Sequence, residues 1–212
     1  MNGLALDGVT LAIAGRTLIE SLDVLVKSGE RVTVMGPSGC GKSSLLAFVA
    51  GTLDPAFTAA GDVRVDGEQV GALPPERRRI GILFQDDLLF PHLSVGDNLA
   101  FALPASLHGR SVRRAAVSKA LAEADLAGFE DRDPATLSGG QRARVAVMRT
   151  LLAAPRALLL DEPFNKLDAQ LRQDFRRFVF DHARERSLPV LLVTHDAADA
   201  EAAGGPIVTL GA

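Results

Sequence analysis

The sequence contains no Trp, no Tyr and one Cys, Cys40. A single cysteine excludes a disulfide within the chain and suits a reducing compartment. No apolar run reaches the roughly 18 residues of a membrane-spanning helix, and the N-terminal residues lack the basic-then-apolar pattern of a signal peptide. The net charge of −3 gives no overall reason to expect nucleic-acid binding. We therefore expect a cytoplasmic protein that would reach a membrane by docking on another protein.

Residues 36–43 fit the phosphate-binding pattern G-x-x-x-x-G-K-[ST] without a mismatch. An apolar run (32–35) precedes them and a helix-forming run (44–50) follows, which is the strand–loop–helix context of such loops. Glycines let successive N–H groups face a phosphate, and the helix directs its positive end at the same anion. Lys42 is predicted to reach the β- and γ-phosphates and Ser43 to bind Mg²⁺. The candidate nucleotide contacts are Gly36, Pro37, Ser38, Gly39, Cys40, Gly41, Lys42, Ser43 and Ser44.

Three further apolar runs end in polar side chains. Residues 79–85 end in Gln85, 157–162 end in Asp161 and Glu162, and 189–195 end in His195. Short Val/Ile/Leu runs between helices predict strands buried on both faces, hence a parallel sheet, and ligands bind beyond the carboxyl ends of such strands. With the phosphate loop, four strand ends then converge on one site. Asp161 is placed to hold Mg²⁺ directly or through water, and Glu162 to polarise a water towards the γ-phosphate.

The rest of the chain predicts a second, smaller sheet and several helices. Residues 4–34 and 61–66 are predicted as short strands of a small antiparallel sheet, with 51–60 as a loop and irregular structure around Pro91, Gly96 and Asn98. Helical patterns cover 111–127, 167–187 and a segment from Ser138 to about Ala153. A last strand is expected at 206–210.

Residues 137–141, Leu-Ser-Gly-Gly-Gln, begin one of these helices. Two glycines beside a capping serine make a second anion site of backbone N–H groups. One nucleotide does not need two phosphate sites, whereas a head-to-tail dimer uses both. Taken alone, however, an ordinary Ser-Gly-Gly helix start is the better explanation.

The chain resembles ABC-type ATPase domains over nearly its whole length. The motifs that carry the resemblance, by their order and rough spacing, are the phosphate loop, Gln85, residues 137–141, 160–163, 167–168 and His195. The resemblance implies an α/β fold: a P-loop NTPase (RecA-like) core with a mostly parallel sheet, a small antiparallel β subdomain and an inserted α-helical subdomain. The expected division of the single domain 1–212 is 1–85 and 151–212 for the core with its β part, and 86–150 for the helical part.

The same resemblance implies a Mg²⁺-dependent ATP hydrolase in which two subunits sandwich two ATP molecules. Lys42, Glu162 and His195 would be catalytic, and His195 would bridge the γ-phosphate and hold the water of Glu162. Gln85 would sense the metal and the γ-phosphate, so that Ser43, Gln85 and Asp161 form the metal site. The nucleotide contacts expected at the dimer interface are Ser138, Gly139, Gly140, Gln141 and Asp168.

Residues 82–98 look like the stretch of bacterial ABC importers that links the ATP site to the membrane subunits. The resemblance implies as partners a second copy of the chain or a paired ABC ATPase, integral membrane permease subunits and a solute-binding protein, at the inner face of the cell membrane. The apolar residues that would line a groove for the permease are Leu88, Leu89, Phe90 and Leu93. The alternative is a buried loop of the helical part.

The sequence departs from the family where adenine is usually stacked on an aromatic ring. Ile13 or Ala14 aligns there, so we expect adenine to be held by weaker apolar contact, without a stacking contribution of about 1–3 kcal/mol. Asn165 replaces a common Ser, which we expect to matter little. Cys40 is either a small residue chosen for fit or a reactive thiol near a helix N-terminus.

Other functions remain open at this point. An ABC exporter ATPase and a soluble ABC ATPase acting on nucleic acid or ribosomes are the alternatives, although nucleic acid is not the expected partner. Residues 165–168 also fit N-K-x-D, the guanine-reading motif of GTPases. They follow Glu162 too closely to have the separate strand that this motif needs.

Overall fold

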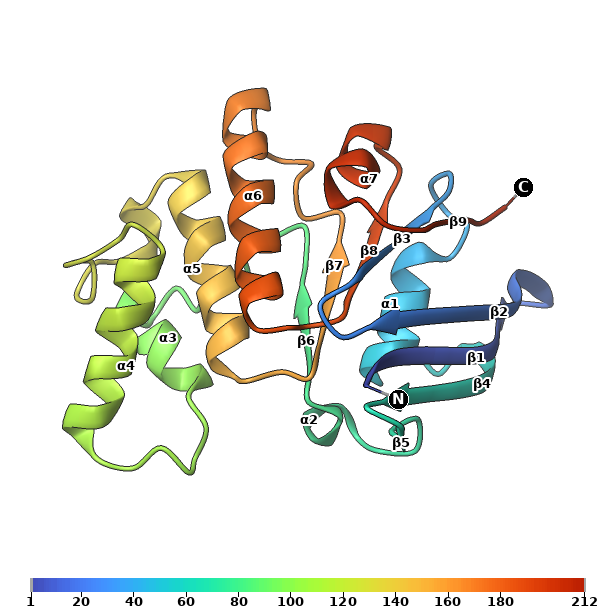
Figure 1. Ribbon diagram of the computed structural model, residues 1–212, viewed down its shortest axis with the longest axis horizontal. Helices are drawn as coiled ribbons and strands as arrows, with labels where there is room; N and C mark the ends of the chain where they lie inside the picture. Colours follow the sequence, from blue (N-terminus) through green and yellow to red (C-terminus); the bar gives the residue numbers. More distant parts are fainter. Residues whose placement is uncertain (1, 212) are drawn as a thin grey trace.

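The computed structural model, which describes residues 2–211, contains two sheets and a group of helices at one end (Figure 1). The strands are β1 (Gly3–Ile13), β2 (Arg16–Lys27), β3 (Arg31–Met35), β4 (Phe57–Val65), β5 (Glu68–Gln69), β6 (Ile80–Leu83), β7 (Ala157–Asp161), β8 (Val190–Thr194) and β9 (Ile207–Thr209). The helices are α1 (Lys42–Ala50), α2 (Pro75–Arg78), α3 (Val95–Ala102), α4 (Arg110–Glu123), α5 (Gly139–Leu152), α6 (Ala169–Glu185) and α7 (Ala197–Ala203), with a 3₁₀ turn at Pro134–Thr136.

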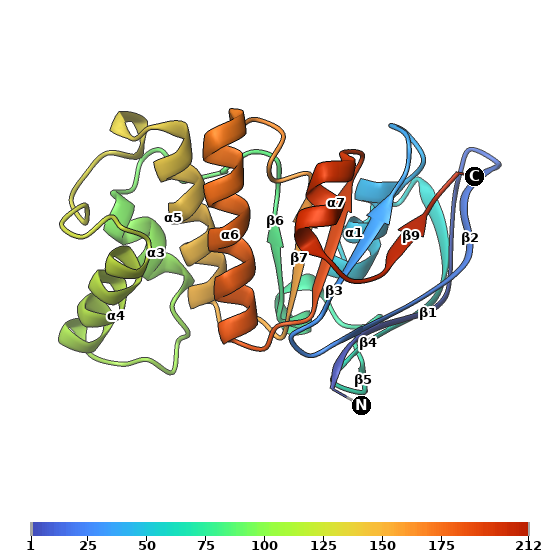
Figure 2. The ribbon, with the colours of Figure 1, turned by 45° about the horizontal axis from the view of Figure 1, so that its top comes forward.

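The larger sheet is parallel, with strand order β6-β7-β8-β3-β9. Alternate residues of β7 and β8 enter different cores: in β7, Leu158 and Leu160 pack with helices α3–α6, whereas Leu159 packs with α1 and the second sheet. Burial on both faces explains why these strands are unbroken apolar runs in the sequence. The predicted parallel sheet is confirmed. Figures 1 and 2 show α1 between the two sheets and α5 and α6 on the opposite face of the parallel sheet.

The smaller sheet is antiparallel, with order β2-β1-β4-β5. The expectation of short strands over 4–34 is wrong in two respects, because β1 and β2 span 11 and 12 residues and β3 belongs to the parallel sheet. Residues 51–60 are also not all loop, since β4 begins at Phe57 and pairs with β1. The first half of β4 is largely exposed and small, so it lacks the apolar alternation that identifies a strand.

One glycine explains how β4 approaches β1 so closely. Gly61 has φ 105°, and a Cβ at this position would lie 2.7 Å from the Cα of Val9. The β1–β4 register shifts at the same place, between Asp7 and Thr10. Glycine is therefore required at a bulge that lets the two strands continue to pair on either side.

The predicted helices at α4, α5 and α6 are confirmed, within a few residues at their ends. The irregular structure expected around Gly96 and Asn98 is in fact helix α3. Ser94 caps it by accepting a hydrogen bond from the backbone N–H of Asp97, and Val95 is fully buried on its inner face. Gly96 fits because this turn lies against the backbone of Glu130, where a Cβ would meet the carbonyl oxygen at 2.9 Å.

Asn98 is fully buried and ties the segment before α3 to the helix. Its Oδ1 accepts a hydrogen bond from the Phe90 N–H at 2.8 Å, and its Nδ2 donates to the carbonyl oxygens of Phe90, Leu93 and Ser94 at 3.0–3.2 Å. Asn usually favours helix caps and turns, because its side chain competes for backbone hydrogen bonds. Here it is tolerated inside α3, because its bonds go to the residues that precede the helix.

We expect Asn98→Ala to lower the free energy of unfolding by about 2–4 kcal/mol, because it leaves buried backbone groups without partners. Urea denaturation of the purified chain measures this loss. The control is Val112→Ala on the exposed face of α4, which should change the same quantity by no more than about 0.5 kcal/mol. Equal losses in the two variants would contradict the role given to Asn98.

Candidate nucleotide-binding site

The phosphate loop joins β3 to α1, as predicted. Gly39 and Gly41 have φ values of 80° and 100°, a left-handed conformation that permits the curl of the loop. Lys42 is the first residue of α1 and is 5% exposed. Its Nζ donates hydrogen bonds to the carbonyl oxygens of Gly36 at 2.8 Å and Pro37 at 3.0 Å, so the ammonium group lies over its own loop. An anion held by the loop would therefore meet a positive charge that is already in place.

The ends of β6 and β7 meet the phosphate loop in one pocket of about 300 Å³, and His195, which follows β8, is outside its lining but in contact with Glu162. This follows from the strand order, which places β6, β7, β8 and β3 side by side with the same direction. The lining residues are Leu18, Ser38, Gly39, Gly41, Lys42, Ser43, Ser44, Gln85, Asp161 and Glu162. Leu18 was missed by the sequence analysis because it comes from β2, whose pattern gives no sign that it approaches Gly41.

The Ser43 hydroxyl donates a hydrogen bond to Asp161 Oδ1 at 3.0 Å. Burial raises the pKa of the Asp161 carboxyl, and the neighbouring Glu162 charge raises it further, whereas the Ser43 bond and Lys42 lower it. An octahedral Mg²⁺ with ligands at about 2.1 Å places adjacent ligand oxygens about 3 Å apart, which is the separation seen here. Mg²⁺ is usually bound by one or two protein oxygen ligands together with substrate phosphates and water, so this hydroxyl–carboxylate pair suits it.

Glu162 stands at the end of β7 with φ 47°, a left-handed conformation uncommon outside glycine. Its Oε1 lies 3.1 Å from His195 Nδ1 and 3.7 Å from Lys42 Nζ. Its Oε2 accepts a hydrogen bond from Asn165 Nδ2. The structure thus brings together the three side chains predicted to be catalytic and adds Asn165, whose substitution was expected to matter little.

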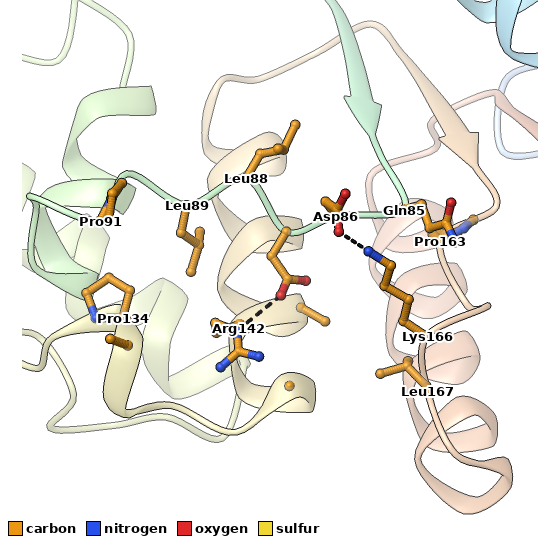
Figure 3. A pocket seen from close by; sticks show the side chains of 14 residues that line it. Gln85, Asp86, Leu88, Leu89, Pro91, Pro134, Arg142, Pro163, Lys166 and Leu167 are labelled. Carbon is orange, nitrogen blue, oxygen red and sulfur yellow. Dashed lines mark hydrogen bonds and ion pairs between the residues drawn. The ribbon is translucent and has the colours of Figure 1, made fainter.

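Gln85 lines both this pocket and a second groove of about 640 Å³. Figure 3 shows the second groove. Two ion pairs cross the groove: Lys166 with Asp86, and Arg142 Nε with Asp87 Oδ2 at 3.4 Å. Burial raises the pKa of the Asp87 carboxyl despite the nearby Arg142. The segment after Gln85 is therefore in contact with both α5 and the turn that precedes α6.

Of the four apolar residues predicted to line a groove, Leu88 and Leu89 do so, whereas Phe90 and Leu93 are absent from its lining. Phe90 instead packs edge-on against Phe101 with ring centroids 4.9 Å apart. Residues 84–94 are not a buried loop, because none of them is buried and Leu88 is 56% exposed.

Residues 138–141 begin α5 with a reciprocal capping box. Ser138 Oγ accepts from the Gln141 N–H at 3.3 Å, and Gln141 Oε1 accepts from the Ser138 N–H at 2.9 Å. Gly140 is buried against Leu171, where a Cβ would be 2.9 Å from a methyl carbon. None of these residues lines the phosphate-loop pocket, and Gly139 faces the second groove instead.

Two further expectations concern single residues. Asp168 is exposed and caps α6 by accepting the Leu171 N–H at 3.0 Å. The Cys40 side chain is buried, and a Cβ on Gly36 would lie 2.7 Å from its sulfur, which favours a small residue chosen for fit over a reactive thiol.

The fold and this pocket define a P-loop nucleoside-triphosphate hydrolase. The family model described as "ABC transporter" matches residues 19–165. The chain therefore belongs to the ABC transporter family, as its motifs predicted, and it is an ATP-binding domain with ATP-hydrolysing activity.

Relatives and solved structures support the same assignment. The chain is 49% identical over 199 residues to the uncharacterized ABC transporter ATP-binding protein YnjD of Escherichia coli K12, covering 94% of this chain and 91% of that protein. It is 40% identical over 207 residues to the Fe(3+) ions import ATP-binding protein FbpC 1 of Haemophilus influenzae, covering 98% of this chain and 62% of that protein. It is 38% identical over 209 residues to the spermidine/putrescine import ATP-binding protein PotA of Mesoplasma florum, covering 99% and 59%. The chain thus spans about three fifths of these two import proteins.

In structure, the chain is similar to the ATP-binding cassette MJ0796, solved as a dimer in a post-hydrolysis state bound to ADP and Pi. The TM-score is 0.81 at 30% sequence identity, over 98% of this chain and 94% of the other. No helix among residues 2–211 is long and apolar enough to cross a bilayer.

Proposed function

We propose that this chain is the Mg²⁺-dependent ATP-hydrolysing subunit of an ABC importer and that two copies, or one copy and a paired ABC ATPase, sandwich two ATP molecules. The observation that carries this proposal is the separation of the two predicted phosphate sites. Lys42, Ser43, Asp161 and Glu162 share one pocket, while the N-terminus of α5, exposed at Ser138 and Gly139, is outside it. A second copy turned head to tail would bring its α5 N-terminus to the γ-phosphate.

The chemistry follows from the side chains of the pocket. The loop N–H groups and Lys42 would hold the β- and γ-phosphates, and Ser43 with Asp161 and Gln85 would hold Mg²⁺. When bound, the metal neutralises charge that develops on the phosphate oxygens. Glu162 would orient and polarise the attacking water. His195 would contact the γ-phosphate and hold the same water in place. Catalysis then consists of positioning and electrostatics.

The helical part, residues 86–150, would carry residues 138–141 to the partner and present the docking surface for a permease. We define this surface by the exposed side chains Phe84, Leu88 and Phe101, which are 45%, 56% and 70% exposed. Leu88 lines the groove beside Gln85, and large exposed apolar side chains of this kind are typical of a protein interface. The surface is continuous with Gln85 through residues 86–88, so docking and the nucleotide site share one segment. The whole assembly would include a solute-binding protein and lie at the inner face of the cell membrane.

The proposal is tested by capturing the tagged chain from detergent-solubilised membranes of its host. We expect integral membrane permease subunits to co-purify, and Leu88→Arg to reduce their recovery at least about tenfold, because the interface would bury a charge. Leu25→Arg is the matched control, since Leu25 is an exposed leucine on β2 of the antiparallel sheet. Co-purification of ribosomes or DNA without a membrane protein would reject the transporter in favour of a soluble ABC ATPase. A permease without any solute-binding protein in its system would favour an exporter.

A further inference from the structure

The carboxylate of Glu162 is held at both of its oxygens. Oε1 lies near His195 and Lys42, at 3.1 and 3.7 Å, and Oε2 accepts the hydrogen bond of Asn165 Nδ2 at 2.5 Å. The Glu162 side chain is only 20% exposed. Hydrogen bonds to a charged group that is largely buried are stronger than those between neutral groups in water.

The local fold fixes Asn165 relative to Glu162. The two residues are the ends of a tight turn, in which the Asn165 N–H lies 3.4 Å from the Glu162 carbonyl oxygen. Phe164, between them, is fully buried and packs edge-on against Phe175 and Phe180 with centroids 5.9 and 5.8 Å apart. The turn is therefore anchored in the core, and the amide has little freedom to leave the carboxylate.

The three contacts of Glu162 should respond differently when ATP binds. Under the proposed function, Lys42 and His195 both have phosphate oxygens to bind once the nucleotide arrives, and both would then release or share Oε1. Asn165 has no such second partner, and its bond is to the other oxygen. It is the one contact of the three that can persist throughout the reaction.

We propose that Asn165 is a positioning residue for Glu162. Its amide N–H holds Oε2, which fixes the rotation of the carboxylate and leaves Oε1 directed at the attacking water. Asn165 itself touches neither the nucleotide nor the water and transfers no proton. This inference rests on the role that the proposed function gives to Glu162.

The test is steady-state ATP hydrolysis by the full chain at saturating Mg²⁺ and ATP. Asn165→Ala removes the donor, so we expect kcat to fall about tenfold while KM for ATP stays within about twofold. Asn165→Asp keeps the shape, removes the donor and adds a like charge beside Glu162, so we expect a fall of about a hundredfold in kcat. The matched control is Gln173→Glu, the same amide-to-carboxylate change on the exposed side of α6, which should leave both constants unchanged.

A double-mutant cycle separates positioning from a structural role. In single-turnover hydrolysis, Asn165→Asp should have no further effect once Glu162→Gln is present, because the carboxylate that it positions is gone. The inference is overturned if both Asn165 variants keep wild-type kcat, if their loss lies in KM, or if their effect persists in the Glu162→Gln background. Normal hydrolysis by Glu162→Gln alone would overturn the proposed function as well, so the two failures are distinguishable.

Discussion

Glu162→Gln is expected to reduce kcat for ATP hydrolysis by at least about a hundredfold, the usual contribution of a positioned general base. The amide has the same shape as the carboxylate but accepts no proton from water. ATP binding should survive, because the loop N–H groups, Lys42 and the Ser43–Asp161 pair are untouched. Replacement also removes the negative charge next to Lys42 and Asp161, which should favour the bound polyanion. The variant should therefore accumulate as an ATP-bound dimer.

Two measurements check this expectation: ATP turnover, and the molar mass of the protein by light scattering with and without Mg²⁺ and ATP. The Glu162→Gln chain should be dimeric with ATP and monomeric without it. Glu76→Gln, an exposed glutamate in the first turn of α2, is the matched control and should hydrolyse ATP like the unchanged chain. Normal turnover by Glu162→Gln would show that another group activates the water.

The parallel sheet and its functional edge could be predicted because burial on both faces leaves a clear pattern. Leu158, Leu159 and Leu160 must all be apolar, since they enter two different cores, and the first polar residue after them marks the strand end. Four strand ends with side chains suited to phosphate or a metal predict a single site at one edge of the sheet. Their convergence follows from strand direction alone and needs no knowledge of side-chain contacts.

The sequence predictions that proved wrong concern segments whose structure depends on tertiary contacts more than on the local sequence pattern. The Asn98 side chain donates to the carbonyl oxygens of Phe90 and Leu93, which lie eight and five residues earlier in the loop before α3, so α3 forms despite Gly96 and Asn98. The start of β4 is stabilised by pairing with β1, more than 40 residues earlier, and its exposed residues carry no strand signal. Leu18 reaches the phosphate loop in the same way, from a strand of the other sheet.

The contact between Asn165 and Glu162 was beyond sequence reasoning for a different reason. It depends on a left-handed backbone at Glu162 and on a turn anchored by Phe164. Neither is encoded by a motif, and an Asn for Ser exchange looks conservative until the geometry shows a carboxylate oxygen within reach. By contrast, a head-to-tail dimer could be proposed from the sequence alone, because the chain carries two predicted phosphate sites and one nucleotide needs only one.

Mixing two inactive variants should restore ATP hydrolysis. A Lys42→Ala chain lacks the lysine of its own pocket but keeps an intact α5 N-terminus, whereas a Ser138→Arg chain keeps the pocket and blocks the α5 N-terminus with a bulky cation. Each homodimer has two defective sites. A heterodimer has one site defective in both halves and one site with Lys42 and Ser138 intact.

Random pairing in an equimolar mixture makes about half of the dimers heterodimers, so about a quarter of all sites would be complete and activity should approach that fraction of the unchanged protein. The measurement is ATP turnover of the mixture against each variant alone, with heterodimers verified by two affinity tags. Specific activity of the unchanged chain should also rise with protein concentration, because the monomer has only half of each site. A Ser138→Arg chain that is fully active alone, or verified heterodimers without recovered turnover, would contradict a site built from two chains. Recovery would place residues 138–140 at the partner's γ-phosphate, because none of them lines the pocket that contains Lys42 of the same chain.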